Sequence, residues 1–140
     1  MKVRFKKLDK NAITPIKAHL TDAGYDLSAI SVYFNICKRY YEYETGISFK
    51  IPEGYVGLVF PRSSISKTKM SLCNSVGVID SHYRGTIRFR FYGGDFQTKY
   101  KIGDKIGQII IIPIPNVELE ESDELSETDR GIKGFGSSGS

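Results

Sequence analysis

Residues 74–91 read N-S-V-G-V-I-D-S-H-Y-R-G-T-I-R-F-R-F, and this stretch indicates the fold class. Its last five residues alternate apolar and basic side chains, which is typical of a strand with one face in water. Gly77 and Gly85 lie on either side of Asp80, at positions where backbone can turn or approach a ligand closely. We therefore predict a β-hairpin that carries one acid, Asp80, and one aromatic ring, Tyr83, near its tip.

The composition is that of one ordinary globular domain. The chain has 140 residues, of which 40% are hydrophobic and 26% charged, enough for a single buried core. The net charge of +4 hides a split, because the stretch Glu118–Asp129 contains seven acids and no base. The residues before it are strongly basic. A basic body suits an anionic ligand such as nucleic acid or a polyphosphate, but a merely solvated basic surface is at least as common.

Targeting and redox features point to the cell interior. No apolar run approaches the roughly 18 residues of a membrane helix. The start, M-K-V-R-F-K-K-L, has no apolar segment behind its basic residues, so we expect an edge strand and no secretory signal. Cys37 and Cys73 have no metal-type spacing, and a disulfide framework is not expected. These features predict an intracellular, cytoplasmic protein, or one that acts inside a host cell if its source is viral.

Short runs rich in Val, Ile, Tyr and Phe, broken by Gly, Pro, Asn and Ser, predict an all-β sandwich or barrel. One short helical turn fits Ser63–Lys67. The segment Ile109–Ile112 is continuously apolar, so we expect cover on both sides, for example from a partner subunit. The predicted strands are Val3–Leu8, Tyr25–Ala29, Val32–Ile36, Ile47–Ile51, Tyr55–Phe60, Ile87–Tyr92 and Ile106–Ile112.

Three further motifs place polar residues near the ends of these strands. D-A-G-Y-D-L-S-A, at 22–29, turns at a glycine and places Asp26 on the opposite face from its neighbours. P-R-S-S, at 61–64, offers an arginine, two hydroxyls and free backbone N–H groups, which together could cradle a phosphate. I-G-D-K-I-G-Q, at 102–108, puts a glutamine into an apolar strand, where it needs hydrogen bonds or a ligand. Each motif alone is equally compatible with ordinary loop structure.

The end of the chain is a separate region. Residues 129–140, D-R-G-I-K-G-F-G-S-S-G-S, are too polar and glycine-rich to build core, and a flexible linker is one interpretation. Arg130 and Phe135 favour another, an arm that orders over a base and a phosphate. We expect a β-barrel domain over residues 1–117, an acidic linker over 118–129 and a glycine-rich C-terminal arm, closing over the active site, over 130–140.

Together and in this order, the motifs closely resemble those of the trimeric dUTP pyrophosphatases, the dUTPases. The likeness spans Asp22 to Gly139 and comprises A-G-x-D-L, P-R-S, G-x-I-D-x-x-Y-R-G, G-D-x-I-x-Q and R-G-x-G-G-F-G-S-S/T-G, with Lys133 where a glycine is usual. The resemblance implies a distorted jelly-roll β-barrel with at most one short helix and a flexible C-terminal arm. It also implies a homotrimer whose active sites are shared between subunits, Mg²⁺ as cofactor, and neither membrane nor nucleic acid as partner.

The activity implied is hydrolysis of dUTP to dUMP and pyrophosphate, which limits uracil in DNA and supplies dUMP for dTMP synthesis. Asp80 would activate the water that attacks the α-phosphorus, and Tyr83 would stack under the deoxyribose. Asp26 would orient waters on a Mg²⁺ held mainly by the substrate phosphates. A single carboxylate suffices as base, because phosphoryl chemistry needs mostly positioning and charge neutralisation. The other residues implied to bind substrate are Arg62, Ser63, Ser64 and Gln108 for the phosphate chain, Asn74, Gly77 and Ile79 for uracil, and Arg130, Phe135, Gly136, Ser137 and Ser138 in the arm.

Two rival functions remain open at this point. A dCTP deaminase shares the fold and a similar R-S-S motif, but that family relies on a glutamate in the central hairpin, and no Glu lies between Glu53 and Glu118. A binding module is the other rival, either a dUTPase-like regulator or a basic barrel for single-stranded nucleic acid. In residues 88–91 bases and rings alternate, so they lie on opposite faces, which argues against the nucleic-acid interpretation. A second, regulatory role stays open.

Overall fold

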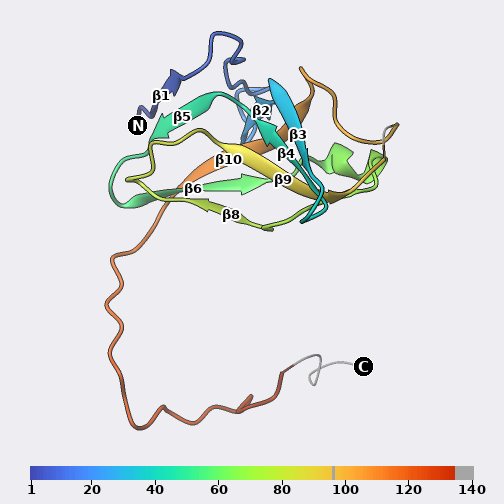
Figure 1. The fold of residues 1–140 in the computed structure, drawn as a ribbon. Helices are drawn as coiled ribbons and strands as arrows, with labels where there is room; N and C mark the ends of the chain where they lie inside the picture. The colour runs from blue at the N-terminus through green and yellow to red at the C-terminus, as the bar shows by residue number, and fades with distance from the viewer. Residues whose placement is uncertain (96, 135–140) are drawn as a thin grey trace.

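The computed structural model describes residues 1–95 and 97–134. Those residues form strands and one short 3-10 helix, η1, at Ser63–Lys67, where the helical turn was predicted (Figure 1). The strands are β1 (Arg4–Lys7), β2 (Tyr25–Ser28), β3 (Ser31–Asn35), β4 (Tyr40–Glu44), β5 (Ile47–Lys50), β6 (Tyr55–Phe60), β7 (Met70–Leu72), β8 (Gly77–Ile79), β9 (Arg88–Gly93) and β10 (Lys105–Pro113).

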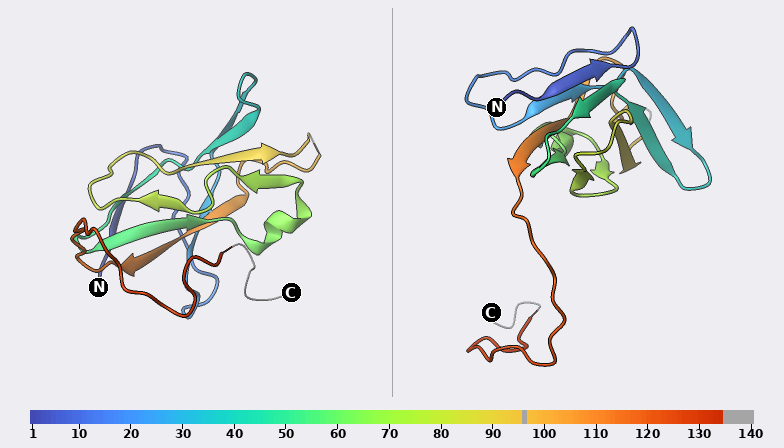
Figure 2. Two further views of the ribbon diagram at one scale, coloured as in Figure 1. Left: turned by 90° about the horizontal axis from the view of Figure 1, so that it is seen from below. Right: turned by 90° about the vertical axis from the view of Figure 1, so that its left-hand side faces the viewer.

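Two four-stranded sheets make the body of the fold. One has the strand order β2-β10-β6-β8 and the other β3-β4-β9-β7, while β1 and β5 form a two-stranded sheet beside them (Figures 1 and 2). All of these strand pairs are antiparallel, and neighbours such as β2 and β10 are far apart in the sequence. Such crossovers between two sheets are typical of jelly rolls, so the predicted fold class is confirmed.

The core lies between the two large sheets. Phe89 and Phe91 on β9 are fully buried, whereas Arg88 and Arg90, which alternate with them, are exposed, as the alternating sequence predicts. Leu27 and Ile109 of the other sheet are also fully buried and belong to the same cluster. The hydroxyl of Tyr43 donates to the carbonyl of Tyr100 at 3.1 Å, which satisfies a polar group inside this core. Packing in this core fixes the positions of β9 and β10, whose outward-facing side chains are partly or fully exposed at the surface.

The hairpin predicted around Asp80 is wrong. Strand β8 pairs with β6 in one sheet, whereas β9 pairs with β4 and β7 in the other, so residues 80–87 are a loop that crosses between sheets. Alternation in a sequence shows that a strand has one wet face, but it does not show which strand lies beside it. The sequence analysis also missed β4, β7 and β8, of which the last two are only three residues long.

The ends of the barrel differ in how well the single chain covers them. On β10, Ile109 is fully buried but Ile112 is 36% exposed, so the predicted cover on both sides is only partial within one chain.

The last backbone hydrogen bond to the barrel runs from Ile114 N–H to the carbonyl of Gly54, at 2.9 Å. Residues 118–134 then extend away from the barrel (Figures 1 and 2), and within the described chain their hydrogen bonds are local.

Two further sequence-based expectations concern the cysteines and membrane segments. Cys37 and Cys73 are both free, so the absence of a disulfide framework is confirmed. Among the residues that the structure describes, no helix has the length and apolar character needed to span a bilayer.

Candidate active site

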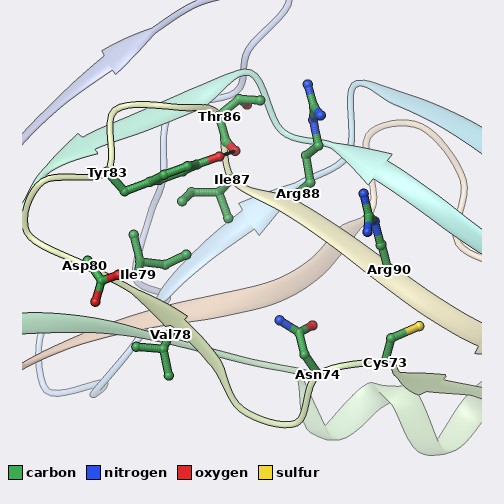
Figure 3. Close-up of a pocket in the computed structure, with 10 residues that line it drawn as sticks. All are labelled: Cys73, Asn74, Val78, Ile79, Asp80, Tyr83, Thr86, Ile87, Arg88 and Arg90. Carbon is green, nitrogen blue, oxygen red and sulfur yellow. Dashed lines mark hydrogen bonds between the residues drawn. The ribbon is translucent and has the colours of Figure 1, made fainter.

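A pocket of about 490 Å³ opens between β8, the 80–87 loop and β9 (Figure 3). In the close-up, the side chains of Asn74, Ile79 and Tyr83 project into this space, and Asp80 lies at one end of it, directly after β8. We call it the β8–β9 pocket. The residues that line it are Cys73, Asn74, Val78, Ile79, Asp80, Tyr83, Thr86, Ile87, Arg88 and Arg90.

The Tyr83 ring is held in place by its own loop. Its hydroxyl donates to the carbonyl of Thr86 at 3.0 Å, and its backbone N–H donates to the carbonyl of Asp80 at 3.1 Å. A Cβ on Gly85 would collide with the ring, so only glycine lets Tyr83 fold back across the loop. The hydroxyl of Ser48 on β5 donates to the carbonyl of Arg84 at 2.8 Å and ties the loop to the barrel. The loop is therefore a fixed support for one aromatic face.

The two arginines of the β8–β9 pocket are neutralised by β4. Glu44 lies 2.6 Å from Arg88 Nε, and Glu42 lies 2.7 Å from Arg90 Nε. The hydrogen bond to Glu44 raises the pKa of the Arg88 guanidinium, so this cation stays charged and paired. Burial raises the pKa of the Cys73 thiol, which keeps that group protonated. The pocket wall is thus polar but close to neutral, which suits a base and a sugar better than a phosphate.

A second hollow, of about 270 Å³, lies where β2, β10 and the end of β6 meet. Asp26 and Gln108 are register partners on β2 and β10, and Gln108 also pairs with Phe60, the last residue of β6. We call this second hollow the β2–β10 hollow. The residues that line it are Ala18, Asp22, Ala23, Gly24, Asp26, Arg62, Ser63 and Gln108. Three of the four sequence motifs that precede the tail, all except the Asp80 motif, therefore meet at one place.

The charges of the β2–β10 hollow centre on one carboxylate. Asp26 contacts Arg62 Nε through one oxygen and Lys105 Nζ through the other, each at 2.9 Å. Gln108 donates from Nε2 to the carbonyl of Pro61 at 3.3 Å, which answers its need for a hydrogen bond. A Cβ on Gly24 would come within 2.5 Å of Gln108 Oε1, so the glycine makes room for that amide. Asp26 therefore bridges two cations, of which Arg62 lines this hollow and Lys105 lines the neighbouring one. Asp22 adds a second carboxylate to the β2–β10 hollow, whereas the neighbouring hollow is lined by the cations Arg62, Lys67, Lys99 and Lys105 and by one acid, Asp104.

The two sites lie at opposite ends of β6. Ile79 pairs with Gly57, so Asp80 comes opposite Val56, whereas Arg62 follows Phe60 at the other end of the strand. Four residues of extended strand separate Val56 from Phe60, a distance of about 13 Å. The two sets of lining residues have no member in common. The structure therefore brings the predicted site residues together as two groups, not one.

The remaining predicted residues lie outside both pockets. Gly77 is buried on β8 opposite Val59, and Ser64 lines a neighbouring hollow together with Arg62. Arg130 is exposed in the extended segment, where its Nε donates to the carbonyl of Lys133 at 3.2 Å. Phe135, Gly136, Ser137 and Ser138 lie outside the described residues.

Several residues in or beside these pockets are not apparent from the sequence motifs. Lys105, which lines the neighbouring hollow, is the second cation on Asp26, and Thr86 has the carbonyl that Tyr83 contacts. Arg88 and Arg90 were noted only as the basic face of a strand. A pattern that could have identified them is the spacing of Glu42 and Glu44, which matches that of the two arginines and suggests cross-strand pairing.

Comparison with known proteins gives a consistent result. A family model described as dUTPase matches residues 10–139. A deoxyuridine 5'-triphosphate nucleotidohydrolase from Tropheryma whipplei strain Twist is 39% identical over 137 residues, covering 94% of this chain and 92% of that protein. The namesake from Escherichia phage T5 is 44% identical over 100 residues, which cover 69% of this chain and 67% of that protein.

Solved structures agree with these sequence matches. A mutant dUTPase from Staphylococcus bacteriophage 80alpha, with dUpNHpp, superposes with a TM-score of 0.82 at 30% identity, covering 99% of both chains. A mutant dUTPase from phage phi11 of S. aureus, described with a structural Mg(II) ion, has a TM-score of 0.73 at 28% identity and covers 89% of this chain and 98% of that one. The matched family model and the curated relatives together establish that this chain belongs to the dUTPase family of nucleotide hydrolases.

Proposed function

We propose that this protein hydrolyses dUTP to dUMP and pyrophosphate, thereby limiting uracil in DNA and supplying dUMP for dTMP synthesis. The observation that carries the proposal is the separation of two complementary surfaces, a near-neutral pocket with Asp80 and a cationic surface on which Arg62 lines both the β2–β10 hollow and the lysine-rich hollow beside it. A nucleotide has the same two parts, a neutral nucleoside and an anionic phosphate chain. Family membership and the dUTP analogue in a similar solved structure support the choice of substrate.

In the proposed reaction, Asp80 accepts a proton from a water molecule as the water oxygen attacks the α-phosphorus. The bond between the α-phosphorus and its bridging oxygen breaks, and pyrophosphate leaves. Asp80 is exposed to solvent, so an attacking water can reach it. Tyr83 supports the deoxyribose, while Asn74, Gly77 and Ile79 contact the uracil. Proton transfer of this kind accelerates reactions by roughly 10²–10⁴-fold.

Positioning of the phosphates is assigned to the β2–β10 hollow, to Ser64 beside it and to the C-terminal arm. Arg62, Ser63, Ser64 and Gln108 bind the phosphate chain, and charge-assisted hydrogen bonds from Arg62 are the strongest of these contacts. Arg130 adds a cation, and the arm residues Phe135, Gly136, Ser137 and Ser138 close over the nucleotide. Closure excludes water other than the attacking one.

Mg²⁺ fits this site as an ion held mainly by the substrate. Both oxygens of Asp26 already contact cations, but each carboxylate oxygen has a second lone pair that can accept from a water. Among the described residues no cluster of three acidic, His or Cys ligands exists, and Mg²⁺ commonly keeps waters and takes phosphate ligands. When bound, the ion would neutralise phosphate charge and polarise the α-phosphorus. Asp26 would then orient its waters.

The distance between the two surfaces supports a shared active site. Within one chain, Asp80 and the phosphate-binding group lie at opposite ends of β6, about 13 Å apart along the strand. We propose a homotrimer in which one copy supplies the β8–β9 pocket and another supplies the β2–β10 hollow. The half-exposed end of β10 is surface that such contacts could cover.

Incubating the purified protein with Mg²⁺ and dUTP, dCTP, dTTP or UTP, followed by chromatography, tests the reaction. Release of dUMP and pyrophosphate from dUTP alone supports the proposal. Deaminated product from dCTP would instead assign the chain to deaminase chemistry. A folded protein that turns over none of the four would favour the binding-module interpretation.

Mixing two variants of strongly reduced activity tests the sharing of sites. Asp80→Asn and Arg62→Ala each remove one surface, but a mixed trimer contains some sites with both surfaces intact. Random assembly after co-refolding at equal amounts restores about a quarter of wild-type activity if each site uses two neighbouring copies. Activity no higher than that of the separate variants would mean that each chain carries a complete site.

A further inference from the structure

Glu44 is the residue through which β4 reaches the Tyr83 loop. Its Oε1 accepts two hydrogen bonds, one from the Thr86 hydroxyl and one from the Gly46 backbone N–H at 3.4 Å. The other oxygen accepts from Arg88 Nε at 2.6 Å. The carbonyl of the same Thr86 accepts the hydrogen bond from the Tyr83 hydroxyl. A chain of hydrogen bonds therefore runs from Glu44 through Thr86 to the ring of Tyr83.

Glu42 offers a natural comparison because it has almost the same setting. It lies two residues away on β4, its side chain is 21% exposed against 25% for Glu44, and it pairs with Arg90. Both partner arginines are on β9, line the same pocket and are about half exposed. Only Glu44 contacts Thr86. Glu42 also lies 3.9 Å from Arg88 Nη1, and Glu44 also accepts from the Gly46 N–H. The two glutamates share the pairing with β9 arginines, and only Glu44 of the two is connected to Tyr83.

We propose that Glu44 is a positioning residue which, through Thr86, fixes the Tyr83 ring and so sets the discrimination between deoxyribose and ribose. This inference rests on the proposed function, in which Tyr83 supports the sugar. A ring that excludes one hydroxyl must be held within a fraction of an ångström, because a small shift would make room for that oxygen. Tyr83 is 45% exposed, so surrounding side chains alone do not hold it. The Glu44–Thr86 contact adds a restraint from β4 to the hydrogen bonds that the loop itself makes to Tyr83.

The test compares kcat/KM for dUTP and for UTP in matched variants. Removing one such positioning contact is expected to lower the dUTP/UTP ratio about tenfold in Glu44→Ala, while Glu42→Ala changes it less than about twofold. Glu44→Gln keeps an acceptor for the Thr86 hydroxyl and should restore most of the ratio. Thr86→Val removes the hydroxyl at nearly constant volume and should match Glu44→Ala. The double variant should be no worse than either single one, because both break the same contact.

Several outcomes would overturn the inference. An unchanged dUTP/UTP ratio in folded Glu44→Ala would do so, and so would an equal fall in Glu42→Ala, which would indicate a general effect of pocket charge. If Glu44→Ala does not fold, Thr86→Val decides, since it leaves both glutamate–arginine pairs in place. If the wild-type protein prefers dUTP to UTP and the variants show the same preference, this inference alone is contradicted. Wild-type protein without dUTP turnover would contradict the proposed function as well.

Discussion

The β8–β9 pocket and the β2–β10 hollow contain similar charged residues but balance them differently. In the pocket each arginine has its own glutamate, Arg88 with Glu44 and Arg90 with Glu42. In the hollow Arg62 and Lys105 share the single carboxylate of Asp26. Residue type alone therefore does not specify which ligand a surface prefers. The number of carboxylates paired with each cation does.

The physical reason is the cost of bringing an anion to a cation that is already paired. A phosphate approaching Arg88 would have to displace a carboxylate 2.6 Å away, whereas Arg62 and Lys105 share one carboxylate and further lysines line the neighbouring hollow. The same argument explains why the pocket keeps two arginines without attracting the triphosphate end of a nucleotide.

Replacing Asp80 by Asn should have the largest effect. Removing the proton acceptor while keeping its shape is expected to lower kcat by about 10²–10⁴-fold. Binding of a non-hydrolysable dUTP analogue, measured by calorimetry, should persist because the rest of the pocket is unchanged. Asp95→Asn alters another exposed acid outside both surfaces and serves as the control. Near-normal turnover by Asp80→Asn would disprove its role as base.

Truncating the arginines one at a time tests the contrast directly. Arg62→Ala should lower kcat/KM for dUTP about tenfold to a hundredfold, as expected for a lost charge-assisted hydrogen bond. Arg88→Ala should lower it less than about threefold, since that charge is already neutralised by Glu44. Steady-state kinetics at low and moderate salt measure both. An equal fall in kcat/KM in the two variants would mean that the charge balance does not determine where the phosphates bind.

Cysteine alkylation should show the smallest effect. Cys37 is exposed between β3 and β4, whereas Cys73 is half-buried in the pocket, where burial raises the pKa of its thiol. A raised pKa means less thiolate at a given pH, so iodoacetamide should modify Cys37 first and reach Cys73 faster as the pH rises. Peptide mass spectrometry at two pH values measures this order. A non-hydrolysable dUTP analogue should protect Cys73 and leave Cys37 unaffected, and equal protection of both would place the nucleotide elsewhere.

Local patterns predicted local structure well. The strand at Tyr55–Phe60 and the helical turn at Ser63–Lys67 have the expected bounds, and the alternation in β9 buries Phe89 and Phe91 as expected. Strand β4, Y-Y-E-Y-E, is absent from the predicted strands although its tyrosines alternate with glutamates in the period-two pattern of a strand. The hairpin at Asp80 was wrong because turn chemistry and alternation are local, whereas strand pairing is set by contacts far apart in the sequence.

The all-β class, the identity of the reactive groups and the polarity of each strand face follow from the sequence alone, since they depend on side chains and their period along the chain. Which of the reactive side chains lie close together depends on the tertiary structure. It placed Asp26, Arg62 and Gln108 together at one end of β6 and Asp80 at the other, and it joined Glu44 to Tyr83 through Thr86. Such distances arise from strand order and register, which many weak long-range contacts fix jointly.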